Sequence, residues 1–277
     1  MATPRLASLR LSGADGGPLP VDVRSGARGA ERRPAVVICH GFKGFKDWGF
    51  FPKLAERLAT AGFTAVSFNL SGSGVSGGDT FDEPERWAQQ RPTADLADLG
   101  TVVDWVVGEG APWVGLLGHS RGGGLAVLQA ARDGRIRSLV SWAAIDDFLR
   151  WDRAEIARWR REGRLDVVNT RTGQVLPILL GALDDIEANR EGPLDIAAAA
   201  ARLGVPWLIV HGTGDESVPC EAARVLAHSS ASPRTELLLL DGAGHTFGIR
   251  HPWAGSTPDF DQVLERSVGW LATSLHG

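Results

Sequence analysis

The sequence predicts an α/β fold, in which a mostly parallel, eight-stranded sheet carries helices on both faces. Short, nearly continuous apolar runs alternate with helix-like patterns along most of the 277 residues. Continuous apolar runs are typical of strands that are covered on both faces, and their alternation with helices favours parallel pairing through right-handed crossovers. A chain of this length can bury a substantial core, either as one large domain or as two smaller ones.

The first predicted element is an N-terminal hairpin, because two stretches of alternating hydrophobicity flank a Gly-rich turn. The later strands are apolar and short, and the helices between them place apolar residues on one face. The predicted strands are residues 6–11, 19–24, 36–39, 64–68, 114–117, 136–142, 207–210 and 236–240, and the clearest predicted helices lie near residues 51–58, 96–107, 125–131 and 259–275.

Residues 146–200 interrupt this alternation of strands and helices. They comprise a charged, Trp-bearing stretch at 148–161, a turn-like stretch at 169–173, and two further helical patterns. More than fifty residues without structure would be unusual in a compact domain. We therefore expect an inserted cap at 146–200 that divides the core into residues 1–145 and 201–277. A peripheral decoration without a role in binding is the alternative.

The pentapeptide Gly118-His119-Ser120-Arg121-Gly122 lies between a predicted strand and a predicted helix. This context is typical of a nucleophile elbow, in which a serine occupies a sharp strand-to-helix turn between small residues. The glycines avoid a clash in a turn that strains the serine backbone. The start of the following helix favours negative charge that develops near the serine oxygen. We therefore expect Ser120 to be a nucleophile.

A serine nucleophile needs a base to take its proton and an acid to orient that base. His245 follows a predicted strand through Asp241-Gly242-Ala243-Gly244, and Asp215 follows another strand in a Gly-containing loop. Since the carboxyl ends of parallel strands meet at one sheet edge, we expect His245 as the base and Asp215 as the acid, in the chain order serine, acid, histidine. The competing candidates are His40, His119, His211, His228, His251 and His276 for the base, and Glu216, Asp146 and Asp147 for the acid, with a helix-capping role as the alternative for Asp215.

An oxyanion hole is expected from two backbone N–H groups, those of Phe42 and Arg121. Arg121 follows the nucleophile directly, and Gly41 lets the loop after the strand ending at Cys39 turn the Phe42 amide toward the site. The Arg121 side chain is expected to pair with a nearby carboxylate and to have no catalytic duty.

These motifs and their order resemble those of the α/β-hydrolase superfamily over nearly the whole chain outside the cap. His40-Gly41-Phe42 and the inserted segment resemble serine esterases such as cinnamoyl and feruloyl esterases, and monoacylglycerol-lipase-like or serine-aminopeptidase-like hydrolases. The resemblance implies a triad of Ser120, Asp215 and His245. Many relatives carry Asp-x-Arg-Gly-x-Gly after the strand 64–68, whereas residues 69–74 here read Asn-Leu-Ser-Gly-Ser-Gly and lack both charges.

Composition argues against several other function classes. A net charge of −4 and a pI near 6.0 give no basic footprint for nucleic acid or an anionic membrane. The sequence shows no secretory signal and no membrane-spanning apolar run, and two cysteines, Cys39 and Cys220, favour a reduced, cytoplasmic protein. No residue cluster has zinc spacing, and no cofactor is implied.

The expected reaction is hydrolysis of a small-molecule carboxylic ester through an acyl-enzyme. Thioester or amide hydrolysis and acyl transfer would use the same machinery, and a non-catalytic binding protein of this fold is a further alternative. An elbow serine disfavours dienelactone hydrolases, which carry cysteine there, and dehalogenases or epoxide hydrolases, which carry aspartate. Five aromatic residues are candidates either for pocket lining or for ordinary core: Phe45, Trp48, Trp142, Trp151 and Trp159.

Overall fold

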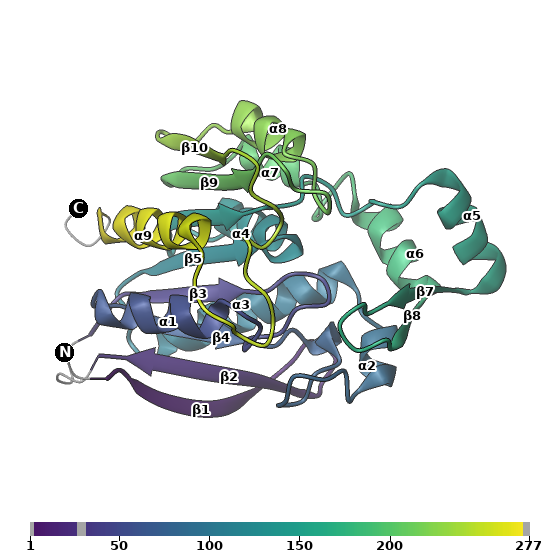
Figure 1. The fold of residues 1–277 in the computed structure, drawn as a ribbon, viewed down its shortest axis with the longest axis horizontal. Coiled ribbons are helices and arrows are strands. Elements are labelled where there is room, and N and C mark those ends of the chain that lie inside the picture. The colour runs from purple at the N-terminus through teal and green to yellow at the C-terminus, as the bar shows by residue number, and fades with distance from the viewer. Residues whose placement is uncertain (1–2, 27–31, 274–277) are drawn as a thin grey trace.

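The computed structural model describes residues 3–26 and 32–273, and among these residues eight strands form one twisted sheet (Figure 1). Its strand order is β1-β2-β4-β3-β5-β6-β9-β10. The pairs β1–β2 and β2–β4 are antiparallel, and the other neighbouring pairs are parallel. The predicted mostly parallel, eight-stranded sheet is confirmed. The strands are β1 (Arg5–Ser12), β2 (Pro18–Ser25), β3 (Ala35–Cys39), β4 (Thr64–Phe68), β5 (Val114–His119), β6 (Ile136–Trp142), β9 (Trp207–Gly212) and β10 (Thr235–Leu240).

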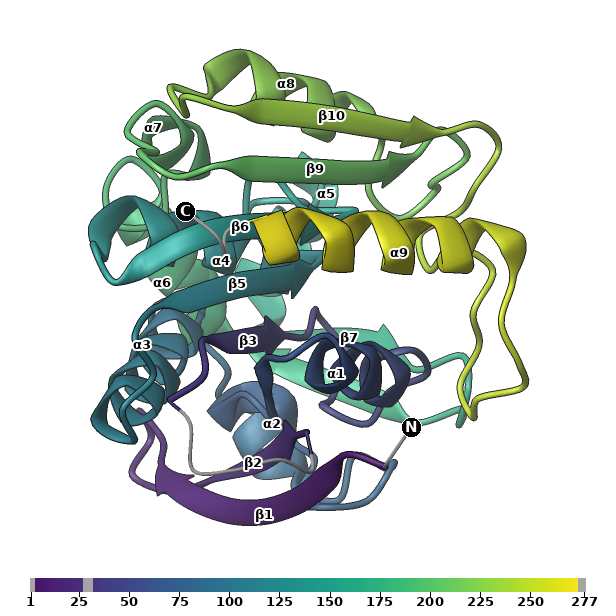
Figure 2. The same ribbon diagram turned by 90° about the vertical axis from the view of Figure 1, so that its left-hand side faces the viewer.

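Helices cover both faces of this sheet (Figure 2). The side chains of β3 alternate between the faces: Val37 packs in a cluster with α3 and α4, whereas Val36 and Ile38 pack in a cluster with α1 and α9. This double burial explains why the strands are continuous apolar runs rather than alternating patterns. The helices outside the segment that follows β6 are α1 (Phe51–Thr60), α2 (Pro84–Ala88), α3 (Pro92–Gly108), α4 (Arg121–Arg132), α8 (Glu221–Ser229) and α9 (Pro258–Thr273), with a 3₁₀ turn η1 (Ser71–Ser73).

The helix starts follow from local sequence. A proline lies in the first turn of α1, α2 and α3, where its fixed φ suits the helix and its missing N–H costs no hydrogen bond. The predicted final helix corresponds to α9, and its expected last two residues lie outside the described residues. His276 also lies outside them.

The part of the segment between β6 and β9 that runs from α5 to α6 forms a projection at one end of the molecule, on the right in Figure 1. A capping box joins Asp152 and Glu155 at the start of its first helix, α5. The predicted turn at 169–173 connects the two strands of an antiparallel hairpin. These strands were not predicted from the sequence, because each carries an exposed apolar residue, Val168 or Val175. The elements are α5 (Arg153–Glu162), β7 (Arg164–Val168), β8 (Val175–Leu179), α6 (Leu180–Asn189) and α7 (Ile196–Ala200).

The projection has its own apolar cluster, in which Trp159 and Leu183 pack with Trp87 of α2 and Phe45 of the loop after β3. By contrast, α7 packs against α4 and α8, and its Ile196 belongs to the core beneath the sheet. The elements α5 to α6 therefore pack on α2 and on the loop after β3, whereas α7 packs in the core. The expected division at residues 146 and 200 stays a proposal.

Candidate active site

Ser120 occupies the junction between β5 and α4. Its backbone angles, φ 57° and ψ −123°, are strained for a residue with a side chain. A Cβ added to Gly118 would overlap the Gly122 carbonyl oxygen, and one added to Gly122 would overlap the carbonyl oxygens of Cys39 and His40. The two glycines are therefore required because the elbow's backbone packs directly on itself and on the end of β3.

His245 and Asp215 lie beside one another, as predicted. Nδ1 of His245 and Oδ2 of Asp215 are 2.7 Å apart. The loops that carry them interlock: a Cβ on Gly212 would overlap the Ala243 carbonyl oxygen, and one on Gly214 would lie 2.7 Å from the carbonyl oxygen of Gly242. Glycines in the Asp215 loop thus allow the close approach that brings the carboxylate to the imidazole.

The Asp215 carboxylate is fully buried and held by several donors. Its Oδ1 accepts hydrogen bonds from the backbone N–H groups of Ser217 and Val218, at 2.8 and 2.9 Å, and its Oδ2 lies 3.3 Å from Nε2 of His211. Burial raises the pKa of Asp215, but the hydrogen bonds from His211 and His245 outweigh it and hold the pKa well below its ordinary value. The side chain therefore stays ionised and can accept a hydrogen bond from Nδ1–H of His245.

Ser120 and His245 line the same cavity, whose volume is about 380 Å³. Its other lining comes mainly from the loop after β3, the segment after β6 and the Asp215 loop. These residues are Phe42, Lys43, Arg121, Ile145, Phe148, Arg150, Trp151, Ser217 and Val218. The cavity thus joins the predicted nucleophile and base to one surface that is partly aromatic and partly cationic.

The loop expected to supply an oxyanion donor lies against the nucleophile. A Cβ on Gly41 would lie 2.8 Å from Cβ of Ser120 and 2.9 Å from the carbonyl oxygen of His119. His40 pins this loop, because its Nδ1 lies 2.9 Å from the Gly41 carbonyl oxygen and its Nε2 accepts the Leu70 N–H at 3.1 Å. Burial lowers the pKa of His40 to about 4, which keeps the ring neutral and its Nε2 an acceptor. The N–H groups of Phe42 and Arg121 remain the predicted oxyanion donors.

His119 contacts the backbone of the loop that carries His245 and is buried beneath it. Its Nε2 lies 2.9 Å from the backbone carbonyl oxygen of His245, and its ring packs against Phe50 and Phe51. Burial lowers the pKa of His119 to about 3, so the ring is neutral and its Nε2–H donates a hydrogen bond to that carbonyl oxygen. From the sequence alone, His119 was only a competing candidate for the base.

The Arg121 side chain pairs with a carboxylate, as expected. Its Nη1 lies 3.4 Å from Oδ2 of Asp95 and donates to Oε1 of Gln90 at 2.7 Å. Its guanidinium carbon also lies 4.6 Å from the centroid of the Phe42 ring. Burial raises the pKa of Asp95 to about 7, and the neighbouring Arg121 opposes that rise. The side chain thereby links the two residues whose amides are the predicted oxyanion donors.

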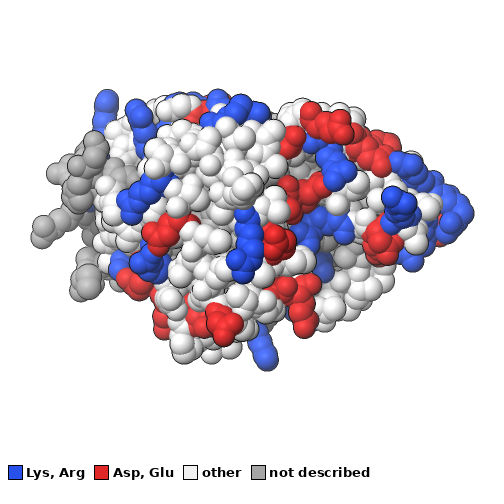
Figure 3. Space-filling view, turned by 90° about the horizontal axis from the view of Figure 1, so that it is seen from above, with Lys and Arg blue, Asp and Glu red and all other residues white. Residues whose placement is uncertain are grey.

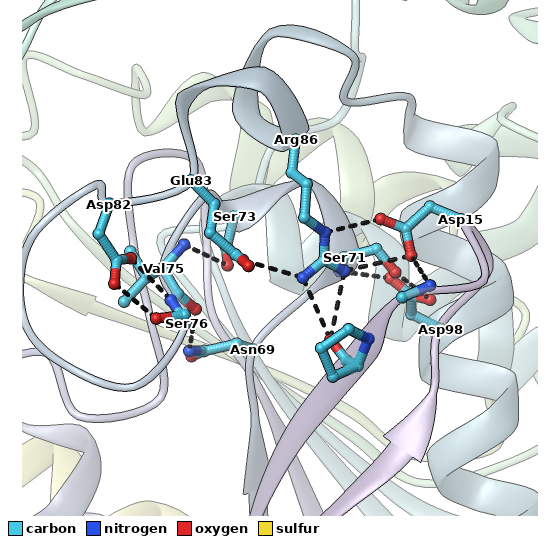
Figure 4. A network of polar contacts seen from close by, with 12 residues as sticks. Asp15, Asn69, Ser71, Ser73, Val75, Ser76, Asp82, Glu83, Arg86 and Asp98 are labelled. Atoms are coloured by element: carbon cyan, nitrogen blue, oxygen red, sulfur yellow. Dashed lines mark hydrogen bonds and ion pairs between the residues drawn. The ribbon is translucent and has the colours of Figure 1, made fainter.

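The uncharged loop after β4 is held by hydrogen bonds in place of the missing charges (Figure 4). Asn69 accepts the Lys46 N–H at 2.7 Å and donates to the Val75 carbonyl oxygen at 2.8 Å. The backbone N–H and hydroxyl of Ser71 both donate to Asp98, at 2.7 and 2.8 Å. The departure from the family pattern therefore leaves the loop anchored and does not involve the residues of the candidate site.

Of the five aromatic candidates, Trp151 is the one that lines the described cavity. Phe45, Trp142 and Trp159 are fully buried in apolar clusters, and Trp48 is partly buried beside His251. Four lining residues were not predicted from the sequence, namely the aromatic Phe42 and Phe148 and the cationic Lys43 and Arg150. Lys43 lies in the segment that follows β3, and Arg150 lies in the segment that follows β6. This position after the carboxyl end of a strand was the signal available in the sequence.

The competing acids and bases lie elsewhere or have other partners. Glu216 is exposed, and Asp147 forms an ion pair with Arg190. His211 sits behind Asp215, and His251 accepts the Gly49 N–H at 3.0 Å. The described part of the chain holds no cluster of His, Cys, Asp or Glu fit for a metal ion, and none of its helices has the length and apolarity to cross a membrane.

The surface charge is mixed, and basic side chains gather at the end that α5 forms, on the right in Figure 3. Several of these cations have acidic neighbours: Arg160 pairs with Glu187 at 2.5 Å, and Arg164 pairs with Asp166 at 3.3 Å. Such local pairing is typical of a solvated helix face.

Comparisons with known proteins show which known fold this architecture matches. Residues 34–166 match a family model described as alpha/beta hydrolase fold. A monoacylglycerol lipase of Mycolicibacterium smegmatis is 26% identical over 266 residues, which cover 88% of this chain and 89% of the lipase. The structure of Est1E from Butyrivibrio proteoclasticus with ferulic acid is similar, with a TM-score of 0.76 at 20% identity, covering 97% of this chain and 100% of that one. The chain has the α/β-hydrolase fold, and its resemblance to the α/β-hydrolase superfamily is confirmed.

Other curated relatives are matched over only part of their length. An uncharacterized 31.7 kDa protein from the traX–finO intergenic region of Escherichia coli is 30% identical over 119 residues. These residues cover 42% of this chain and 39% of that protein.

Proposed function

We propose that this protein is a serine hydrolase that cleaves carboxylic esters through an acyl-enzyme intermediate. Ser120 is the nucleophile, His245 the base and Asp215 the orienting acid. The observation that carries the proposal is the 2.7 Å hydrogen bond between His245 and Asp215, with Ser120 and His245 facing one cavity. The name of one relative, a monoacylglycerol lipase, supports ester substrates for this chain.

The hydrogen bond to Asp215 selects the tautomer of His245 that the reaction needs. An ionised carboxylate accepts a hydrogen bond from the N–H at Nδ1, so the proton stays on Nδ1 and the Nε2 lone pair is free to take the Ser120 proton. The Ser120 oxygen then attacks the ester carbonyl, and the carbonyl π electrons move onto its oxygen. When the tetrahedral intermediate collapses, the imidazolium returns the proton to the departing alcohol.

Water completes the cycle by the same route in reverse. His245 takes a proton from the water as it attacks the acyl-enzyme, and returns that proton to the Ser120 oxygen when the carboxylic acid leaves. The N–H groups of Phe42 and Arg121 stabilise the oxyanion in both halves, and removing one such donor typically costs about 10²–10³ in rate. Asp215 stabilises the imidazolium and remains ionised throughout.

The test is hydrolysis of p-nitrophenyl butyrate by the wild type and by Ser120→Ala. The variant is expected to lose about 10⁶-fold in kcat, the loss typical of a removed nucleophile that works as a unit with its base. Ser12→Ala, an exposed serine at the end of β1, is the matched control and should keep wild-type turnover. A folded Ser120→Ala with undiminished turnover would contradict the proposal.

A further inference from the structure

The cavity that Ser120 and His245 line has an uneven charge. Three cationic side chains line it, namely Lys43, Arg121 and Arg150, while the described residues place no Asp or Glu on its wall. These cations are not equivalent, because their partners differ. The partners decide which of them is available to a ligand.

Arg121 already has two partners within the protein. It lies 3.4 Å from Asp95 and donates to Gln90, and both partners are buried. Arg150 instead donates to the backbone carbonyl oxygen of Ser217 at 2.6 Å, a neutral partner that holds the guanidinium at the cavity without cancelling its charge. Arg150 is therefore positioned yet remains electrostatically unpaired among the described residues.

Lys43 is the most telling of the three. Within the described ranges, no carboxylate lies within ion-pair distance of its ammonium, which sits 5.9 Å from the centroid of the Phe42 ring. The side chain is half-buried, and burial lowers the pKa of the ammonium. A partly desolvated, unpaired cation gains strongly from an anionic partner, because the cost of desolvation has already been met within the folded protein.

The backbone at Lys43 is also strained. Its φ of 57° is in the left-handed region, where glycine is far more comfortable than lysine. A strained residue beside an active-site loop is a reason to look for a function in its side chain. Here the residue with the left-handed backbone carries an ammonium group that lines the cavity, one residue from the Phe42 amide.

We propose that Lys43 and Arg150 form an anion-recognition subsite and that the preferred substrates are esters carrying a free carboxylate. This inference rests on the proposed ester hydrolysis and specifies the substrate class. Carboxylate recognition by these cations is distinct from oxyanion stabilisation, because it depends on a group remote from the scissile bond. A matched pair of esters that differ only in that group can separate the two roles.

The first pair is the p-nitrophenyl monoester of glutaric acid and its neutral methyl ester, which place the carboxylate in the acyl part. The second pair is 4-acetoxybenzoate and its neutral methyl ester, which place it in the alcohol part. In at least one pair, Lys43→Met should lower the ratio of kcat/KM for the anionic ester over the neutral ester about tenfold, the typical effect of one charge-assisted hydrogen bond. For the wild type, the ratio of kcat/KM for the anionic ester over the neutral ester should also fall as salt is raised from about 0.05 to 0.5 M, because the salt screens the attraction between the carboxylate and the cations.

Lys43→Gly is the second variant, because glycine relieves the strained φ and removes the charge without threatening the fold. Lys53→Met is the control, since Lys53 is exposed on α1 and paired with Glu56. Equal losses on both members of each pair would assign Lys43 to the oxyanion and overturn the proposal. Unchanged ratios in both variants would overturn it as well.

A binding measurement separates this inference from the proposed chemistry. Monomethyl glutarate or 4-acetoxybenzoate, or both, should raise the Tm of Ser120→Ala, and the shift should disappear in the double variant Ser120→Ala with Lys43→Met. A wild type that hydrolyses none of the four esters refutes the proposed function, while the Tm shift still decides the subsite. Absence of a shift in Ser120→Ala contradicts the subsite even if neutral esters are hydrolysed.

Discussion

The substitution Gly41→Ala tests how closely the loop after β3 must approach the nucleophile. The added Cβ would lie 2.8 Å from Cβ of Ser120 and 2.9 Å from the His119 carbonyl oxygen, whereas contacts between carbon atoms are favourable at about 3.5–4.0 Å. The loop must therefore retreat by roughly 0.7 Å or more to relieve the first contact. The Phe42 amide, one residue further on, moves with it, away from the position where an oxyanion forms.

A displacement near 1 Å can cost about 10²-fold in rate, and loss of one oxyanion donor costs about 10²–10³-fold. We therefore expect kcat for p-nitrophenyl butyrate to fall about 100-fold, equivalent to about 2.7 kcal/mol of transition-state stabilisation. Gly134→Ala is the matched control, because a Cβ there meets nothing within 4 Å. Circular dichroism and thermal unfolding establish that both variants are folded. A folded Gly41→Ala with wild-type kcat would refute the reasoning.

Two further predictions concern the carboxylate behind the base and a buried histidine. Asp215→Asn should leave the fold intact but lower kcat by about 10⁴-fold, because an amide no longer enforces the required tautomer of His245, and steady-state kinetics checks this. The pKa of His40 is depressed from 6.5 to about 4 in the folded state, so its contribution to stability is complete above pH 6.5 and is lost as the pH falls toward 4. Urea unfolding should show the stability difference between wild type and His40→Asn shrinking by about 2 kcal/mol from pH 7.5 to pH 5.0, and a constant difference would contradict a buried neutral ring.

Much of the fold could be predicted because strands that are buried on both faces of the sheet have a recognisable, continuous apolar sequence. Val36 and Val37 face opposite layers and are both fully buried, so β3 reads as one continuous apolar run. The hairpin of β7 and β8 could not be found in this way. It lies outside the main sheet, and its exposed Val168 and Val175 remove the alternation that identifies a half-buried strand.

The candidate site shows the same division between local and long-range information. Ser120, Asp215 and His245 could be predicted because each follows a strand, and parallel strands bring their carboxyl ends to one edge. The support given by His119 to the His245 loop spans 126 residues of sequence, and no local pattern encodes it. The cationic lining was not predicted for a similar reason. Tertiary packing gives Arg121 an acidic partner and leaves Lys43 beside the Phe42 ring, and no local pattern distinguishes the two residues.

The central claim is that Ser120 forms a covalent bond during the reaction, and trapping that bond tests it most directly. A fluorophosphonate probe incubated with the wild type, followed by proteolysis and mass spectrometry, should place one adduct on Ser120. The adduct should be absent from Ser120→Ala and strongly slowed in a variant with His245→Ala, because the base no longer activates the oxygen. A folded wild type that acquires no adduct, or acquires it on another residue, would contradict the account.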